Sequence, residues 1–241
     1  MAPKRKVAVS KVAKPKPNSK PESKTKAKAP KVAKTSTNGK PIPPPTSHAY
    51  KYEGNPDTGI NYWLIKSEPV SRIDPKTQQD VKFPLSDLVG KDIEETWDGV
   101  RNYEARNNMV VMSKGDIALF YHSNCDTPGI VGEVEISHEA HVDETQFNTK
   151  HKSYDSKSTR ENPKWWCVDV KFRRRFRRKL SLKELQAKAD QLPEFLLLTR
   201  GRLSVIPVGY ELYTKLVEME CEGDIQDDLD CEIDRALINV K

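Results

Sequence analysis

The first 57 residues contain almost nothing from which a hydrophobic core could be built, and this confines the fold to the rest of the chain. They consist mainly of Lys, Pro, Ala, Ser and Thr, with no aromatic side chain before Tyr50. Such a segment cannot bury enough surface to offset the entropy of ordering it. We therefore expect disorder over residues 1–57, one folded domain over 58–219 and an acidic tail over 220–241.

The net charge of +6 is unevenly distributed along the 241 residues. Residues 1–50 hold 13 Lys and Arg against the single acid Glu22, whereas residues 218–241 hold nine acids against Arg235 and Lys241. The basic character therefore belongs to the N-terminal tail, and the folded part is close to neutral. A tail of this kind raises nonspecific affinity for nucleic acid through counterion release.

The tail begins with a compact basic cluster, Pro3-Lys4-Arg5-Lys6-Val7. Clusters of this type are bound by the nuclear import machinery, so the sequence predicts that partner and a location in the nucleus. The alternative is a solvated lysine tail that binds polyanions loosely, and the two interpretations are compatible.

Two further absences in the sequence exclude classes of protein. No stretch approaches the roughly 18–20 apolar residues of a membrane-spanning helix, and the charged N-terminus lacks the apolar segment of a secretory signal. No membrane partner is expected.

The four cysteines of the chain lie far apart, without CxxC spacing: they are Cys125, Cys167, Cys221 and Cys231. This spacing argues against a structural zinc site or a disulfide framework and fits a reducing compartment.

Hydrophobic periodicity places most strands in the middle of the domain. The patterns predict strands over residues 62–66, 117–121, 130–136 and 166–173. They predict helices over 101–112 with Asp98 as the cap, after the Ser181/Glu184 capping box, and from Pro207 onward. Strands that cluster in this way argue against a doubly wound sheet. We expect an α+β domain with a small curved or closed β structure flanked by helices.

No motif of a known catalytic or cofactor site occurs in the sequence. There is no P-loop, no GxSxG and no GxGxxG after a strand. Ser123 and His122 are adjacent strand residues, so they point to opposite faces and are not a nucleophile–base pair. His138 and His141 are likewise expected on opposite faces, without a third ligand. The sequence predicts no cofactor, no metal site and no enzyme.

Instead, one short segment combines aromatic and amide side chains. Residues 97–107 contain Trp97, Asn102, Tyr103 and two arginines around a glycine. A planar ring beside amide groups can stack on a nucleobase and hydrogen-bond its edge. The alternative is that the two aromatic side chains anchor a loop to the core, which composition alone favours. Residues 66–69 and 121–123, at two strand ends, could form the rim of the same pocket, or be turns.

A second segment, residues 173–179, carries six cations in seven residues, with no acid between them. We call it the arginine ridge. At the end of a strand, such a ridge is suited to phosphate contacts. Its proposed phosphate ligands are Arg173, Arg174, Arg175, Arg177 and Arg178.

At these residues the sequence resembles the EVE-domain family, and within it a nuclear group from eukaryotes. The matching stretches are residues 63–69, 97–107, 115–123, 129–132 and 202–208. The resemblance implies a PUA-like fold, which is a small β-barrel with helices packed around it. This architecture is similar to that of the YTH and SRA modules, which flip a modified base into an aromatic-lined pocket. It implies a non-enzymatic reader of modified bases, in particular of 5-hydroxymethylcytosine or 5-methylcytosine in DNA.

The resemblance also assigns roles to individual residues. Trp97 would be the stacking wall, with Asn102 and Tyr103 near the base edge. Trp63, Lys66 and Ser67 would line the opposite side, with His122 and Ser123 at the rim and Arg202 and Ser204 at the base of the cleft. Arg101 and Arg106 would hold flanking phosphates. The arginine ridge is more basic than the family leads us to expect, and the polar residues 149–164 would form either a disordered or a substrate-facing loop.

Three other functions stay open at this point. The same fold could read modified RNA, as the likeness to YTH modules permits. A nuclease or base-processing enzyme would need an acid–base pair, for which Glu68, Asp98 and His122 are the nearby candidates. A scaffold that recruits partners through its two charged tails is the remaining alternative.

Overall fold

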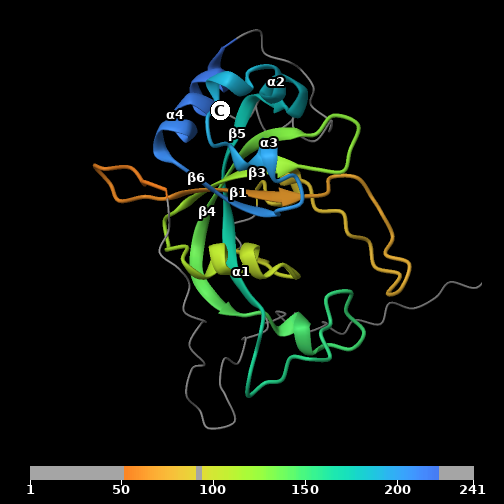
Figure 1. Ribbon diagram of the computed structural model, residues 1–241. Helices are drawn as coiled ribbons and strands as arrows, with labels where there is room; N and C mark the ends of the chain where they lie inside the picture. Colours follow the sequence, from red (N-terminus) through yellow and green to blue (C-terminus); the bar gives the residue numbers. More distant parts are fainter. Residues whose placement is uncertain (1–51, 91–93, 223–241) are drawn as a thin grey trace, which may run out of the picture. The chain divides into compact units, whose positions relative to one another are not determined.

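The computed structural model describes residues 52–90 and 94–222, which form an α+β domain (Figure 1). The basic cluster at residues 3–7, the rest of the tail through residue 51, and residues 223–241 lie outside the described residues. The folded part begins before residue 58, because the backbone N–H of Tyr210 donates to the carbonyl oxygen of Glu53 at 3.0 Å.

The domain is built on one mixed sheet of six strands in the order β2-β5-β4-β3-β1-β6. β1 and β3 are parallel, and the other neighbours are antiparallel. No pairing joins the edge strands β2 and β6 among the described residues, so the sheet is open there. The α+β class and the strand-rich middle are confirmed. The strands are β1 (Tyr62–Ser67), β2 (Glu95–Trp97), β3 (Ile117–His122), β4 (Gly129–Val142), β5 (Trp166–Ser181) and β6 (Val205–Val208).

Four α-helices flank the sheet: α1 (Tyr103–Val110), α2 (Leu182–Ala187), α3 (Leu196–Thr199) and α4 (Tyr210–Cys221). Three 3₁₀ turns, η1 (Leu85–Asp87), η2 (Glu144–Phe147) and η3 (Ala189–Gln191), lie in the connections. Figure 1 shows α2, α3 and α4 at one end of the domain and α1 on the other side of β1 and β6. α4 contacts the sheet through aromatic rings, because Tyr62 of β1 stacks on Tyr213 of α4 with ring centroids 3.9 Å apart.

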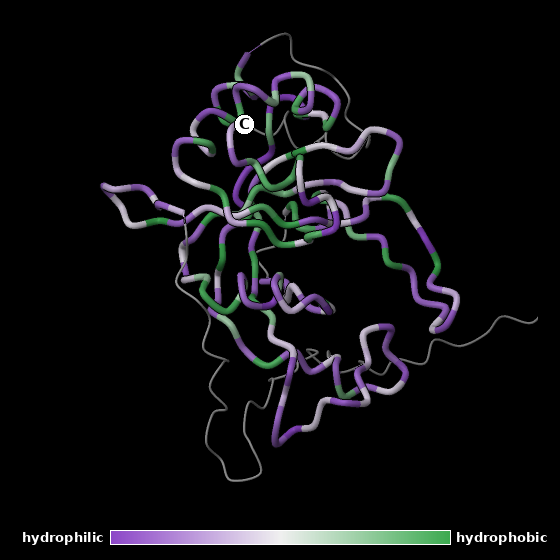
Figure 2. Tube along the Cα trace, in the orientation of Figure 1, coloured by the Kyte–Doolittle hydropathy of each residue, from purple (hydrophilic) through white to green (hydrophobic). Residues whose placement is uncertain are grey.

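The hydrophobic core follows the central strands. In Figure 2 the hydrophobic segments run through the middle of the domain, and the peripheral loops are hydrophilic. Trp63, Leu64, Ile65 and Phe120 are fully buried, so β1 and β3 are covered on both faces. This explains why both strands are short, continuous apolar runs in the sequence.

Two helix starts differ from the sequence prediction, and one agrees with it. The cap of α1 is Asn102, whose side-chain oxygen accepts from the backbone N–H groups of Glu104 and Ala105, and not Asp98. Pro207 lies in β6, an edge strand where a missing N–H donor is tolerated, and α4 begins after Gly209. The predicted Ser181 cap is confirmed, because its hydroxyl accepts from the N–H of Glu184.

Replacing Asn102 with alanine is expected to lower the free energy of unfolding by about 1 kcal/mol, because two N–H groups at the start of α1 lose their acceptor. Denaturant unfolding measures this change. Asn107→Ala, inside the same helix, is the matched control and should change stability by less than about 0.5 kcal/mol. Equal losses in the two variants would show that the cap contributes nothing specific.

Candidate nucleic-acid interface

The candidate site lies where the carboxyl ends of the parallel strands β1 and β3 meet. Ser67 and His122 are paired in the register of the two strands. Beyond them, the backbone N–H and the hydroxyl of Ser123 both donate to the carbonyl oxygen of Ser67 at 2.8 Å. The backbone N–H of Phe83 donates to the carbonyl oxygen of Glu68, also at 2.8 Å, and brings a third segment to this edge.

Four aromatic rings pack together beside this edge. The ring of Trp97 meets Phe83 and Phe120 edge to face, at centroid distances of 5.8 and 5.6 Å. Phe120 in turn meets His122 at 5.7 Å. We call Phe83, Trp97, Phe120 and His122 the aromatic cluster. Trp97 is only 8% exposed, so most of its ring surface is already covered by protein.

Asp98 follows the aromatic cluster at the end of β2 and is the most unusual ionisable group of the site. Its side chain keeps contact with solvent, yet desolvation by the surrounding protein, followed by the charge of Asp143, raises the pKa of its carboxyl to about 6. Within the described residues it has no hydrogen-bond or ion-pair partner. From the sequence, Asp98 is predicted only as a helix cap or an acid–base candidate, because neither the desolvation of its carboxyl nor its proximity to Asp143 can be seen there.

Residues 143–165 form a loop that covers the start of the segment 97–107, and Arg101 anchors this loop. The guanidinium donates to Asp143 at 2.7 Å, to Thr145 at 3.0 Å and to the carbonyl oxygen of Ser153 at 2.6 Å. The buried Asp143 also accepts from the N–H of Gly99. The donors of Arg101 are therefore used inside the protein, and its role in phosphate binding stays a prediction that these contacts do not favour.

The same loop is ordered, which excludes disorder, the first of the two alternatives for residues 149–164, and leaves the substrate-facing loop as the second. Gln146 lies at its centre, fully buried, and its side-chain oxygen accepts from the backbone N–H groups of Lys164 and Trp165 at 3.0 Å. The indole N–H of Trp165 donates to Asp155 at 2.7 Å. The positive charge of the exposed Lys152 acts on the carboxyls of both Glu68 and Asp98, so the tip of the loop lies near the candidate site.

The residues of α1 are held together in a separate stack. Tyr103 is 54% exposed and stacks on Trp165 with centroids 4.7 Å apart. Arg106 lies over the Tyr103 ring at 5.1 Å and donates to the carbonyl oxygen of Lys164. The side-chain oxygen of Asn102 is occupied by the helix cap. Arg106 is thus a loop anchor like Arg101, whereas Tyr103 presents a ring to solvent.

The side chain of Lys66 lies on the other face of the sheet from that of Ser67, because successive strand residues alternate. The Lys66 ammonium donates to the carbonyl oxygen of Gly201 at 2.9 Å, and burial lowers its pKa to about 8. The exposed Arg202 follows Gly201, and the carbonyl oxygen of Ser204 accepts from the backbone N–H of Lys66. The structure therefore separates Lys66, Arg202 and Ser204 from the aromatic cluster.

Trp63 shares the face of Ser67 but belongs to the core. It has no exposed surface, and its indole N–H donates to Asp116 at 3.0 Å. It supports the sheet and offers no ring face to a ligand. The Ser67 hydroxyl is also buried and has no hydrogen-bond partner in the described part of the chain.

The arginine ridge lies within β5, not at its end, and acids from other elements neutralise much of it. Arg174 pairs with Glu133 of β4 at 2.8 Å and with Glu220 of α4 at 3.2 Å. Arg173 also pairs with Glu133 at 3.2 Å, and Arg178 pairs with Glu184 at 2.8 Å.

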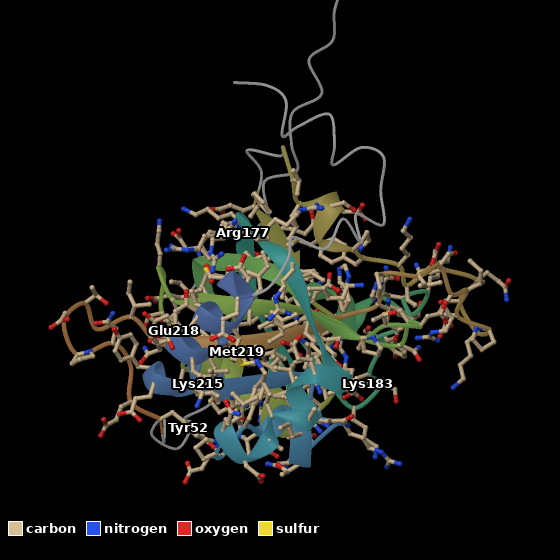
Figure 3. The ribbon with its side chains drawn as sticks, turned by 90° about the horizontal axis from the view of Figure 1, so that it is seen from above. Tyr52, Arg177, Lys183, Lys215, Glu218 and Met219 are labelled. Carbon is tan, nitrogen blue, oxygen red and sulfur yellow. The ribbon has the colours of Figure 1, made fainter. Side chains whose placement is uncertain are left out.

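These contacts bring the end of α4 against β5. Arg177 and the α4 residues Glu218 and Met219 are labelled in Figure 3, and the guanidinium of Arg178 donates to the Met219 carbonyl oxygen. Arg175 is likewise not without an interaction partner, whereas the side chain of Arg177 is exposed to solvent. Arg173, Arg174 and Arg178 therefore pair with acids of the protein itself, and their role as phosphate ligands stays a prediction that these ion pairs do not favour. The sequence showed no acids between the arginines, but the fold supplies them from β4, α2 and α4.

The three candidate acid–base residues do not form a hydrogen-bonded pair with one another among the described residues. Glu68 makes a two-point ion pair with Arg72 at 2.8 Å and accepts from Asn124. The Nε2 atom of His122 accepts from the backbone N–H of Leu85 at 3.1 Å.

No helix in the described ranges has the length and apolar character needed to cross a bilayer.

Comparison with known proteins shows the family to which this domain belongs. The model of the EVE domain matches residues 61–219. The chain is 45% identical to thymocyte nuclear protein 1 of Gallus gallus over 70% of its own length and 73% of that protein. It is 43% identical to the protein of that name from Homo sapiens, over 66% and 74% of the two chains. The chain belongs to the EVE domain family.

Solved structures agree with this assignment. Human THYN1 protein in complex with DNA containing 5-methylcytosine matches with a TM-score of 0.64 and 41% identity, over 68% of this chain and 99% of that one. A protein from Pseudomonas putida matches with a TM-score of 0.58 and 38% identity, over 66% and 99% of the two chains. The expected family and fold are thus confirmed.

Proposed function

We propose that this protein is a non-enzymatic reader of modified cytosine in DNA, with 5-methylcytosine or 5-hydroxymethylcytosine as the recognised base. The observation that carries the proposal is the solved relative, which was bound to DNA containing 5-methylcytosine and aligns over nearly its whole length at 41% identity. The domain that would contact DNA is therefore present in full in this chain.

We infer that the base is extruded from the duplex and bound at the ends of β1, β2 and β3. Extrusion costs a few kcal/mol, which stacking and hydrogen bonds to the base edge would recover. The aromatic cluster supplies an apolar wall next to Asp98, the exposed and unpaired carboxyl. Tyr103, the exposed ring on α1, is suited to stack on a neighbouring base.

The raised pKa of Asp98 suits it to the edge of cytosine. That edge offers one acceptor, N3, and one donor, the N4 amino group. A protonated carboxyl can donate to N3 and accept from N4 at the same time, whereas a carboxylate would place negative charge against the N3 lone pair. Binding would thus favour the neutral acid and raise its pKa further above about 6.

A pH series on Asp98 variants tests this proposal. Affinity for a duplex with one 5-methylcytosine should fall as the pH rises above about 6, by up to about tenfold per pH unit. Asn mimics the neutral acid, so Asp98→Asn should bind with an affinity that does not depend on pH. Asp98→Ala should bind weakly throughout, and Asp126→Asn, at an exposed acid, should behave like the parent chain. Affinity that instead rises through the same range would contradict the neutral-acid account.

We also propose that the basic tail serves entry into the nucleus and nonspecific attraction to DNA. The names of the relatives and the cluster at residues 3–7 support this part. Near the site, Lys152 is suited to a flanking phosphate, and Arg173 and Arg177 are the exposed residues among the predicted phosphate ligands. Microscopy of the chain with and without residues 3–7 tests the import role, which is wrong if both forms enter the nucleus equally.

A further inference from the structure

A group of three metal-ligating side chains lies on β4 and β5, away from the site described above. His138, His141 and Asp169 each offer one ligand atom, and these atoms all lie within 4.8 Å of one another. The sequence pattern predicted that the two histidines would point to opposite faces, without a third ligand. That prediction is wrong, because the register of β4 against β5 shifts on both sides of His138. Such irregularities interrupt the alternation of a strand and re-aim its side chains.

Both imidazoles are oriented by their Nδ1 atoms. Nδ1 of His138 lies 2.8 Å from the carbonyl oxygen of Glu139, and Nδ1 of His141 lies 3.4 Å from that of Val142. A carbonyl oxygen only accepts, so the Nδ1 atom of His138 carries the proton that faces it. Nδ1 of His141 also lies 3.4 Å from Sγ of Cys167. The Nε2 atom of His138 is left for another partner and that of His141 faces Asp169, which is the usual arrangement of histidines that bind metal.

The third side chain is held in the same manner. Nε2 of His141 lies 2.9 Å from Oδ1 of Asp169, a distance that requires a proton or a metal ion between the two atoms. The hydroxyl of Thr96 donates to the same oxygen at 2.8 Å. The carboxylate is therefore positioned by contacts with both His141 and Thr96.

We propose that His138, His141 and Asp169 form a binding site for a divalent transition metal ion of the Zn²⁺ class. Two imidazoles and one carboxylate are a donor set that Zn²⁺ takes, with the fourth position of the tetrahedron left for water. His138 is exposed and the other two side chains are half-buried, so the ion can reach the site from solution.

The position of this site gives it a structural consequence. His138 and His141 come from β4 and Asp169 from β5, and Thr96 links Asp169 to β2. β2 has only three residues and lies at the edge of the sheet. A bound ion would thus tie three neighbouring strands together next to Trp97, whose side chain alternates to the opposite face from Thr96. The inference does not depend on the proposed reading of DNA.

Zinc titration of the full-length, tag-free protein by calorimetry tests the proposal. We expect one Zn²⁺ per chain and a raised unfolding temperature in its presence. His138→Ala removes an exposed ligand without touching the His141–Asp169 pair, and affinity should fall at least about 100-fold. Asp169→Asn should lose binding similarly, and His151→Ala, on the 143–165 loop, should bind like the parent chain.

Cobalt gives a second measurement that a merely folded protein would not produce. Co²⁺ bound by two imidazoles and a carboxylate should show the visible absorption of a tetrahedral site, and His138→Ala should abolish it. If the parent chain binds no Zn²⁺, or if His138→Ala and Asp169→Asn bind it as tightly as the parent, the three side chains are only a hydrogen-bonded cluster and the proposal is wrong.

Discussion

Replacing Trp97 with alanine is expected to lower the free energy of unfolding by about 3–5 kcal/mol, the range typical of a buried aromatic ring cut back to a methyl group. The ring packs edge to face on Phe83 and Phe120 and has lost most of its contact with solvent. Its removal leaves a cavity beneath the site as well as fewer aromatic contacts. Denaturant unfolding measures the change directly.

The matched control for this variant is Tyr103→Ala. Tyr103 is also aromatic, but its ring is exposed and stacks on one neighbour, Trp165, so its loss should cost only about 0.5–1.5 kcal/mol. Loss of DNA binding in Trp97→Ala would therefore not identify a pocket wall by itself. Unchanged stability together with lost preference for the modified base would contradict the core role and restore Trp97 as the stacking wall.

Replacing Asp143 with alanine should destabilise the domain by a similar amount, about 3–5 kcal/mol, because one partner of a buried ion pair is removed. The Asp143 side chain has no exposed surface, and its loss leaves Arg101 and the N–H of Gly99 without their acceptor. We expect the 143–165 loop to detach locally, which hydrogen exchange over its backbone amides would detect.

Acid should have the same effect as this substitution. Burial alone would raise the pKa of Asp143, but hydrogen bonds from Thr145 and Arg101 lower it below the ordinary value. A carboxyl whose pKa is depressed in the folded state stabilises the fold at every pH above its ordinary pKa. This contribution to the free energy of unfolding is lost as the pH falls through the folded-state pKa. In Asp143→Ala the acid-induced loss should be smaller than in the parent chain.

Glu144→Ala is the control for this prediction. Glu144 is adjacent in sequence, but it pairs with Arg160 at the surface and both side chains are well exposed. An exposed pair contributes about 0–1 kcal/mol. If Asp143→Ala proves no less stable than Glu144→Ala, the loop is held by other contacts and its anchoring by Arg101 is wrong.

Much of the sheet could be predicted from the sequence, because β1 and β3 are continuous apolar runs and the alternation in β4 and β5 is clear. What could not be predicted depends on contacts between distant segments. The irregularities that turn His138 and His141 to one side reflect the pairing of β4 with β5. Pro207 satisfies the rule for a first helical residue, yet its pairing with Trp63 places it in β6.

The candidate site shows the same division. The sequence motifs lie at the ends of β1, β2 and β3, but the sequence could not separate the side chains that are exposed there from those that support the fold. Arg101 and Arg174 look like phosphate ligands until Asp143, Glu133 and Glu220 are brought against them. The pKa of Asp98 is raised only after folding desolvates its carboxyl and brings it close to Asp143.

The central claim is tested most directly by the affinity of the full chain for one duplex with cytosine, 5-methylcytosine or 5-hydroxymethylcytosine at a single position, measured at increasing salt. Phosphate contacts weaken steeply with salt, whereas the hydrogen bonds and stacking of an extruded base do not. We predict that affinity for all three duplexes falls, and that the ratio in favour of one modified base persists. Equal affinities with the same steep salt dependence would contradict a base reader and leave only attraction to the backbone.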